Sequence, residues 1–187
     1  MTKLPFLFAA TAVLLASCAT DSPPLEKSDF PTHPAAGNHH VVVGKFTDTR
    51  KLPANYLGII HGGPSGEHQK LETSKPVTDI VAQRFTASLA DSGYGEESAP
   101  ANWTLTGEVR EFSCERYKTS GATVDIVVKL TKTGTDKPSF TKSFIAEKTS
   151  ADAAKPAEMQ ALADATLQQV ASNVLHDPEF TQVIASE

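Results

Sequence analysis

The stretch ATVDIVVKLTKT, residues 122–133, alternates between apolar and polar side chains over most of its length. Successive side chains of a β-strand point to opposite faces of the sheet, so this alternation predicts one buried and one solvated face. The buried face would carry Val124, Ile126, Val128 and Leu130. A sheet with a single covered face is typically antiparallel, and this sets the fold class that we expect.

Two neighbouring stretches have the same character. Residues 102–114 and 139–149 each place large apolar side chains on one side of an extended chain. Residues 119–121 and 134–138, which separate the three stretches, are rich in glycine and small polar residues. Such residues favour turns, so we expect three consecutive antiparallel strands.

The segment before these strands also has β character. Residues 41–46, VVVGKF, form a short apolar run that predicts a strand covered on both faces. Residues 47–74 are longer than an ordinary connection, which indicates structure hidden within them. Residues 56–61 and 68–73 are strand-like and flank the glycine-rich residues 62–66, so this segment predicts a β-hairpin.

Two segments show the apolar spacing of amphipathic helices, residues 75–92 and residues 156–175. Each supplies one apolar stripe that can cover the apolar face of a sheet. We therefore expect an α+β two-layer sandwich, with a mostly antiparallel sheet of about four to six strands and two helices packed on one face. Beyond them, Phe180, Val183 and Ile184 would dock the C-terminal tail or form a short helix.

The N-terminus has the pattern of a secretion signal. Lys3 precedes an uncharged apolar segment that is shorter than the roughly 20 residues needed to span a bilayer. The quartet Leu15-Ala16-Ser17-Cys18 follows and resembles the lipobox of bacterial lipoproteins. The resemblance implies recognition of Leu15, Ala16 and Ser17, cleavage before Cys18, and attachment of diacylglycerol and an N-acyl chain to Cys18. The alternative is an ordinary signal peptide with an incidental cysteine.

We expect three segments along the chain: a signal peptide (1–17), the lipidated cysteine with a flexible proline-rich tether (18–38), and a single periplasmic α+β domain (39–187). Ala19, rather than aspartate, follows the cysteine. By resemblance to enterobacterial sorting rules, this favours the outer membrane over the inner membrane.

The chain is acidic, which restricts its partners. Removal of the signal segment, which contains Lys3, changes the formal net charge from −5 to −6. An acidic domain without a polybasic cluster has no electrostatic attraction for nucleic acid or for anionic lipid headgroups. We therefore expect contact with the membrane through the lipid anchor, and a partner that is an envelope protein or a lipid. With Cys18 acylated, Cys114 is the remaining thiol, and we expect it to be buried.

Residue spacing gives no indication of catalysis or of metal binding. The histidines lack the spacing of a zinc site, and no nucleophile motif or phosphate loop is present. We expect no enzymatic activity, no metal and no cofactor besides the covalent lipid. His61 and His68 flank the turn of the predicted hairpin, where their side chains could approach each other.

The long segment 47–74 is the best candidate for a binding loop, because loops on a rigid scaffold often carry function. The alternative is a hairpin that only extends the sheet. Within this segment, Asp48 and Arg50 could organise the loop or form part of a binding surface. The candidate residues are Asp48, Arg50, Tyr56, Gly58, His61, Gly62 and Gly63.

Several short motifs resemble the YajG-type family of small bacterial lipoproteins. A strand ends in FTDTR at residues 46–50, YLG follows at residues 56–58, and a helix opens with KPV at 75–77 and closes with LADSGY at 89–94. The resemblance implies an anchored envelope protein and supplies no catalytic residues. The order of elements also resembles the lipopolysaccharide-assembly lipoprotein LptE and auxiliary lipoproteins of ABC-type lipid transporters.

The favoured hypothesis is a membrane-anchored lipoprotein whose periplasmic domain is a non-enzymatic binding or assembly module of the cell envelope. The alternative is a lipid or glycan carrier, or an auxiliary component of an envelope transport system, which needs an apolar groove between sheet and helices or in the hairpin. A third, less favoured hypothesis is an enzyme that acts on envelope polymers, with Asp48, His61 and His68 converging in a cleft.

Overall fold

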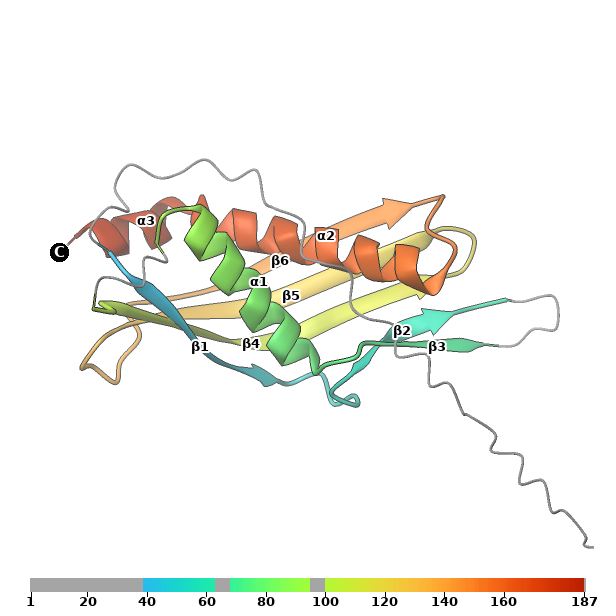
Figure 1. Cartoon of the computed structure of the whole chain (residues 1–187), viewed down its shortest axis with the longest axis horizontal. Coiled ribbons are helices and arrows are strands. Elements are labelled where there is room, and N and C mark those ends of the chain that lie inside the picture. The colour runs from blue at the N-terminus through green and yellow to red at the C-terminus, as the bar shows by residue number, and fades with distance from the viewer. Residues whose placement is uncertain (1–38, 63–67, 95–99, 187) are drawn as a thin grey trace, which may run out of the picture.

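The computed structural model describes residues 39–62, 68–94 and 100–186 of the chain. The expected signal peptide with Leu15, Ala16 and Ser17, the lipidated Cys18, the tether, and Gly63 lie outside the described residues. Within the described part, a six-stranded sheet carries helices on one face (Figure 1).

The sheet is built around one long strand, β4. The strands are β1 (Val41–Asp48), β2 (Tyr56–Ile60), β3 (Gln69–Glu72), β4 (Trp103–Arg116), β5 (Ser120–Lys132) and β6 (Phe140–Ser150). They follow the order β3-β2-β4-β5-β6, and β1 also pairs with β4. The pairs β2–β3, β4–β5 and β5–β6 are antiparallel, whereas β1 and β2 run parallel to β4. This confirms the predicted hairpin and the mostly antiparallel sheet.

Strands β1 and β2 share one edge of β4. β1 pairs with β4 from Trp103 to Val109, and β2 pairs with it from Cys114 to Arg116. The other edge of β4 is occupied by β5 along its whole length. The chain between β1 and β2 therefore leaves the sheet and returns to the same edge, which places residues 49–55 at the middle of the fold.

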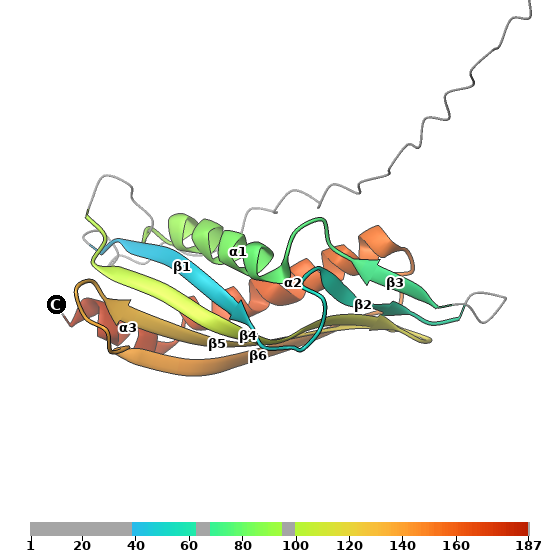
Figure 2. The same ribbon diagram turned by 90° about the horizontal axis from the view of Figure 1, so that it is seen from below.

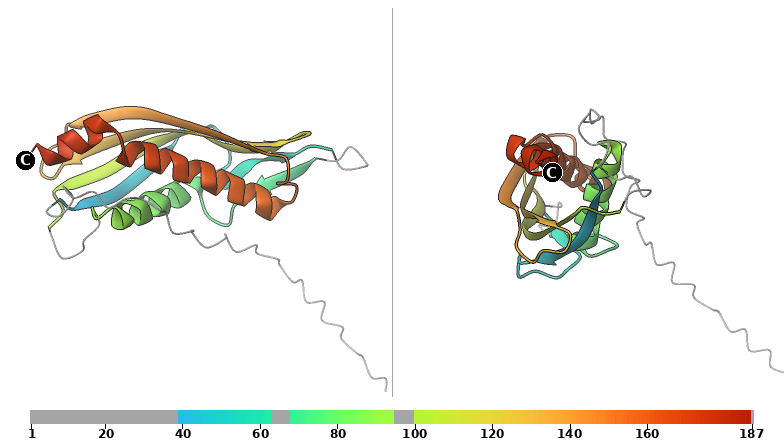
Figure 3. Two further views of the ribbon diagram at one scale, coloured as in Figure 1. Left: turned by 90° about the horizontal axis from the view of Figure 1, so that it is seen from above. Right: turned by 90° about the vertical axis from the view of Figure 1, so that its left-hand side faces the viewer.

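Helices α1 (Val77–Asp91) and α2 (Pro156–Leu175) pack on the same face of the sheet, and the opposite face carries no helix of the described part (Figures 2 and 3). α1 lies over β1, and α2 lies over β5 and β6. The predicted two-layer α+β sandwich is therefore confirmed. The C-terminal segment forms the short helix α3 (Pro178–Ala185), whose N-terminus is capped by the Asp177 carboxylate.

The predicted apolar stripes of both helices form the core. The buried residues of these stripes are Val77, Val81, Phe85, Leu89, Met159, Ala163, Leu167, Val170 and Val174. Facing them, Phe46 of β1 stacks on Phe85 with ring centroids 5.5 Å apart. Because every one of these side chains is at most 2 % exposed, the space between sheet and helices is filled.

The expectation that β1 is covered on both faces is wrong. Val41 and Phe46 are buried, but Lys45 and Thr47 are exposed, because the outer face of the sheet carries no second layer. An apolar run alone does not distinguish a strand covered on two faces from one covered on one face.

Candidate functional site

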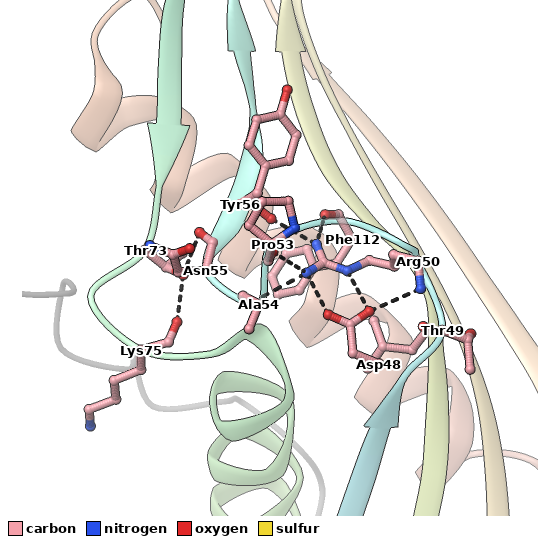
Figure 4. A network of polar contacts seen from close by, with 11 residues as sticks. Asp48, Thr49, Arg50, Pro53, Ala54, Asn55, Tyr56, Thr73, Lys75 and Phe112 are labelled. Atoms are coloured by element: carbon pink, nitrogen blue, oxygen red, sulfur yellow. Dashed lines mark hydrogen bonds and ion pairs between the residues drawn. The ribbon is translucent and has the colours of Figure 1, made fainter.

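Arg50, which lies in the predicted binding segment 47–74, fills the gap between β1 and β2 (Figure 4). Its side chain is only 2 % exposed. Nε and Nη2 donate to the two carboxylate oxygens of Asp48 at 2.9 and 2.8 Å. Nη1 donates to the backbone oxygens of Tyr56 at 2.8 Å and Phe112 at 3.0 Å. The second Nη2 hydrogen is directed to the Pro53 and Ala54 oxygens, at 3.5 Å each. The five N–H donors of the guanidinium are thus all used within the fold.

The electrostatics of this pair follow from its geometry. The hydrogen bonds and charge of Arg50 hold the pKa of the Asp48 carboxyl below its usual value, against a smaller opposing effect of burial. The backbone N–H of Arg50 also donates to Asp48 Oδ1 at 3.0 Å. Asp48 and Arg50 therefore act as one structural unit that closes the turn after β1.

The rest of this turn connects three elements. Thr49 donates from its backbone and its hydroxyl to the Val109 oxygen on β4. Asn55 O accepts from the backbone and the hydroxyl of Thr73, and Ala54 O accepts from the Val77 backbone at the start of α1. Segment 49–55 consequently ties β4, the hairpin and α1 together. Asp48, Arg50 and the backbone of Tyr56 have structural contacts that account for their presence.

The close approach of β2 to β4 explains the glycine at position 58. It lies opposite Cys114 in the parallel pairing of β2 with β4. A Cβ added at Gly58 would lie 1.9 Å from the backbone oxygen of Cys114, and backbone cannot move aside. Only glycine allows the two strands to approach this closely.

His61 and His68 approach each other at the end of the hairpin, as expected. Their ring centroids are 4.9 Å apart in an edge-to-face arrangement, and the Tyr117 ring stacks on His61 at 4.0 Å. A cavity of about 590 Å³ opens beside them. Its lining residues are Ile60, His61, Gly62, His68, Gln69, Arg116, Tyr117 and Ala154. We refer to it as the hairpin cavity; Asp48 does not line it, so the structure does not bring Asp48 and the two histidines into one cleft.

A second hollow, the outer groove, lies on the uncovered face of the sheet. Its volume is about 410 Å³, and its lining residues are Glu111, Ser113, Glu115, Tyr117, Thr119, Gly121 and Thr123. Tyr117 borders both hollows and its residue surface is 66 % exposed. Sequence reasoning missed Arg116 and Tyr117; the available signal was a large exposed aromatic residue beside a predicted turn.

The remaining thiol is buried as expected. Cys114 has no exposed surface, its Sγ lies 3.4 Å from the Met159 oxygen, and desolvation raises its pKa to about 11. In the described ranges, no three residues of the types His, Cys, Asp and Glu are grouped so that they could hold a metal ion. Nor does this part of the chain include a helix with the length and apolar character of a membrane span.

Solved structures share this fold. A Xanthomonas campestris protein aligns with a TM-score of 0.62 and 20 % identity, over 80 % of this chain and 90 % of that one. An uncharacterised protein aligns with a TM-score of 0.53 and 14 % identity, over 77 % of this chain and 92 % of its own. At such identities, the likeness concerns the fold alone.

Sequence comparison identifies the family. Among curated proteins, the comparison gave no significant match. Residues 33–185, in contrast, match the model of a protein family described as uncharacterised lipoprotein. The narrower assignment to the YajG type stays a prediction. Because the match spans most of the sequence, the chain belongs to this lipoprotein family.

Proposed function

We propose that this lipoprotein is a non-enzymatic assembly module that docks an extended segment of another envelope protein against strand β6. In this proposal, Cys18 carries the lipid, the following residues to position 38 form the tether, and the domain lies in the periplasm at the outer membrane. Membership of a lipoprotein family and the Leu15–Cys18 quartet support the anchor.

The observation that carries the proposal is the free edge of β6. This strand pairs with β5 through 11 residues without a register shift, and among the described residues no strand pairs with its other edge. An edge strand presents unpaired N–H and C=O groups to any extended chain. Proteins usually protect such edges by short length, proline, a bulge or charged side chains. β6 has no proline and no register shift, and its lysines are Lys142, which pairs with Asp177, and Lys148 near its end.

An apolar side chain marks the middle of this edge. Ile145 is 56 % exposed, and it lies opposite Asp125 on the face of the sheet that carries no helix. At the opposite end of the strand order, β3 has only four residues, so it offers a much shorter template. In recognition by strand addition, backbone hydrogen bonds supply affinity and side chains such as Ile145 supply specificity.

The filled interior favours a protein partner over a carried lipid. A carrier would need an apolar groove, but Phe85, Leu167 and Val170 between the layers have no exposed surface. The hairpin cavity is lined in part by histidine, glutamine and arginine side chains, which do not suit an acyl chain.

Site-specific crosslinking in intact cells tests the proposal. A photoreactive amino acid is placed at each position from 141 to 149 in turn, and crosslinked peptides of the partner are mapped by mass spectrometry. If the partner adds a strand to the sheet, the crosslinked residue of the partner should shift along its sequence as the photoreactive position shifts along β6. Crosslinks scattered over unrelated proteins, or absent along β6, would contradict the proposal. The same reagent at Gln169, exposed on α2, is the matched control.

A substitution provides the second test. Ile145→Lys places a charge where the partner would pack, so it should abolish the ordered crosslinks while leaving the fold intact. Thr131→Lys adds the same charge to β5, away from the edge, and should leave them unchanged. An equal loss of crosslinks in both variants would contradict a docking site at the β6 edge.

A further inference from the structure

The hairpin cavity and the outer groove meet at Tyr117, at the end of the sheet where the β2–β3 hairpin lies beside the turn between β4 and β5. This place is separate from the proposed docking edge. Backbone pairing fixes the position of this end of the hairpin. Ile60 pairs with Arg116, and the backbone N–H of His61 donates to the backbone oxygen of Arg116 at 2.8 Å. The two hollows have opposite chemical character.

The hairpin cavity offers hydrogen-bond donors for an anion. Among the described residues, its lining includes Arg116, which is always charged, together with His61 and His68, and no acidic residue. His61 Nε2 is shielded from solvent and has no hydrogen-bond partner among the described residues. A shielded nitrogen without a partner is costly, so a ligand that supplies an oxygen would be stabilised here. The guanidinium of Arg116 disfavours a divalent metal ion in the same cavity.

The outer groove offers acceptors instead. Glu111 and Glu115 line it together with the hydroxyl groups of Ser113, Thr119 and Thr123. Ser113 Oγ donates to Glu111 at 2.9 Å, which leaves the second oxygen of that carboxylate for other donors. Such a lining suits a ligand rich in hydroxyl groups and repels an anion.

Tyr117 lies between the hairpin cavity and the outer groove. One ring face stacks on His61, with an interplanar angle of 9°. The large exposure of the residue leaves the other side accessible from the outer groove. An exposed aromatic face provides an apolar platform for the C–H face of a saturated ring.

We propose that these two hollows bind a phosphorylated sugar. The phosphate accepts hydrogen bonds from Arg116, His61 and His68, and the sugar ring lies on Tyr117 with its hydroxyl groups directed to Glu111 and Glu115. A soluble sugar phosphate and the phosphorylated headgroup of a glycolipid share this chemistry. The site goes beyond the proposed docking of a protein segment, and neither proposal depends on the other.

Isothermal titration calorimetry of the acylated protein, cleaved before Cys18, in detergent micelles tests the site. The probes are glucose 6-phosphate, inorganic phosphate and glucose. Because the phosphate and the ring contribute together, glucose 6-phosphate should bind at least about tenfold more tightly than either part alone. Butyl glucoside 6-phosphate distinguishes a glycolipid headgroup from a soluble sugar phosphate. If it binds as tightly as glucose 6-phosphate, the result supports a glycolipid headgroup. If it binds much more weakly, the result supports a soluble ligand.

Variants assign the roles. Arg116→Gln should weaken glucose 6-phosphate binding at least about tenfold, because a charge-assisted contact is lost. Tyr117→Ala should reduce the affinity for glucose 6-phosphate to that for inorganic phosphate. Tyr117→Phe keeps the aromatic ring and should retain most of the affinity for glucose 6-phosphate. Lys118→Gln removes the neighbouring exposed charge and should have little effect. The proposal is overturned if no phosphate probe binds at millimolar concentration, if Lys118→Gln matches Arg116→Gln, or if Zn²⁺ binds and the sugar phosphate does not.

Discussion

Arg50 and Asp48 form a two-point ion pair, with Nε 2.9 Å from Oδ1 and Nη2 2.8 Å from Oδ2, in the gap between two strands that share one edge of β4. The same guanidinium satisfies the Phe112 oxygen, which lies where neither β1 nor β2 pairs with β4. The pair thus replaces missing strand pairing with side-chain hydrogen bonds. In this protein it adds a side-chain link between β1, the hairpin and β4, which also pair through backbone hydrogen bonds.

Arg50→Lys should therefore be strongly destabilising. Lysine keeps the charge but lacks the planar fork, so the Asp48 carboxylate and two backbone oxygens lose partners. We expect the free energy of unfolding to fall by about 3 kcal/mol. Urea denaturation followed by circular dichroism measures this, with Arg110→Lys on the exposed part of β4 as the control. A loss below about 0.5 kcal/mol, as for an ordinary surface substitution, would argue against the structural role.

The same pair predicts a dependence of stability on pH. Because Arg50 lowers the folded-state pKa of Asp48 below its ordinary value of 3.8, the ion pair stabilises the fold fully above that value. This contribution is lost as pH falls through the lowered pKa. Asp48→Asn should cost about 2 kcal/mol at neutral pH. The difference from the unsubstituted protein should then shrink below pH 3.8. Asp136→Asn, in an exposed loop, should show no such convergence when unfolding is measured across pH.

Gly58 gives a test of strand approach. Gly58→Ala places a Cβ 1.9 Å from the Cys114 oxygen, so β2 must separate from β4. We expect a loss of at least about 3 kcal/mol in the free energy of unfolding, at the upper end for overpacking. Gly121→Ala is the matched control, because its Cβ would have no neighbour within 4 Å. Similar thermal unfolding midpoints for the two variants would refute the close approach.

The parts of the fold that follow local periodicity could be predicted. The strand at residues 122–133 and the helix at 156–175 repeat their pattern over many residues, and the structure has β5 and α2 there. β1 has only a six-residue apolar run as its signal, and this run gave the wrong number of covered faces.

The candidate sites were less predictable, because they depend on residues distant in sequence. Arg50 contacts Phe112, 62 positions away, so its local sequence left a structural and a binding interpretation open. The register of Ile60 with Arg116 creates the hairpin cavity, and no local pattern encodes that pairing. The nearness of His61 and His68 could be predicted, because a single hairpin turn relates them.

A buried charge connects the two helices. Arg84 of α1 is 1 % exposed and forms an ion pair with Asp164 of α2. Asp164→Ala removes its carboxylate partner and should cost about 3 kcal/mol. Replacing both partners by apolar residues, Arg84→Met with Asp164→Leu, should recover most of this loss, because the desolvation cost of the charge disappears. Urea denaturation of both variants measures the recovery; a double variant less stable than Asp164→Ala would contradict it.

Cys114 should be unreactive in the folded protein. Desolvation raises its pKa to about 11. Only roughly one thiol in a thousand is therefore ionised at pH 8, and the thiolate is the reactive form. The residue also has no exposed surface, so reaction with the thiol reagent DTNB should be slow in buffer and fast in urea.

The same titration in urea tests the lipid anchor. If Cys18 is acylated, one thiol per chain reacts, and Cys114→Ala should remove the signal completely. Two reactive thiols would show that Cys18 is free, and rapid reaction in buffer would show that β4 opens at Cys114.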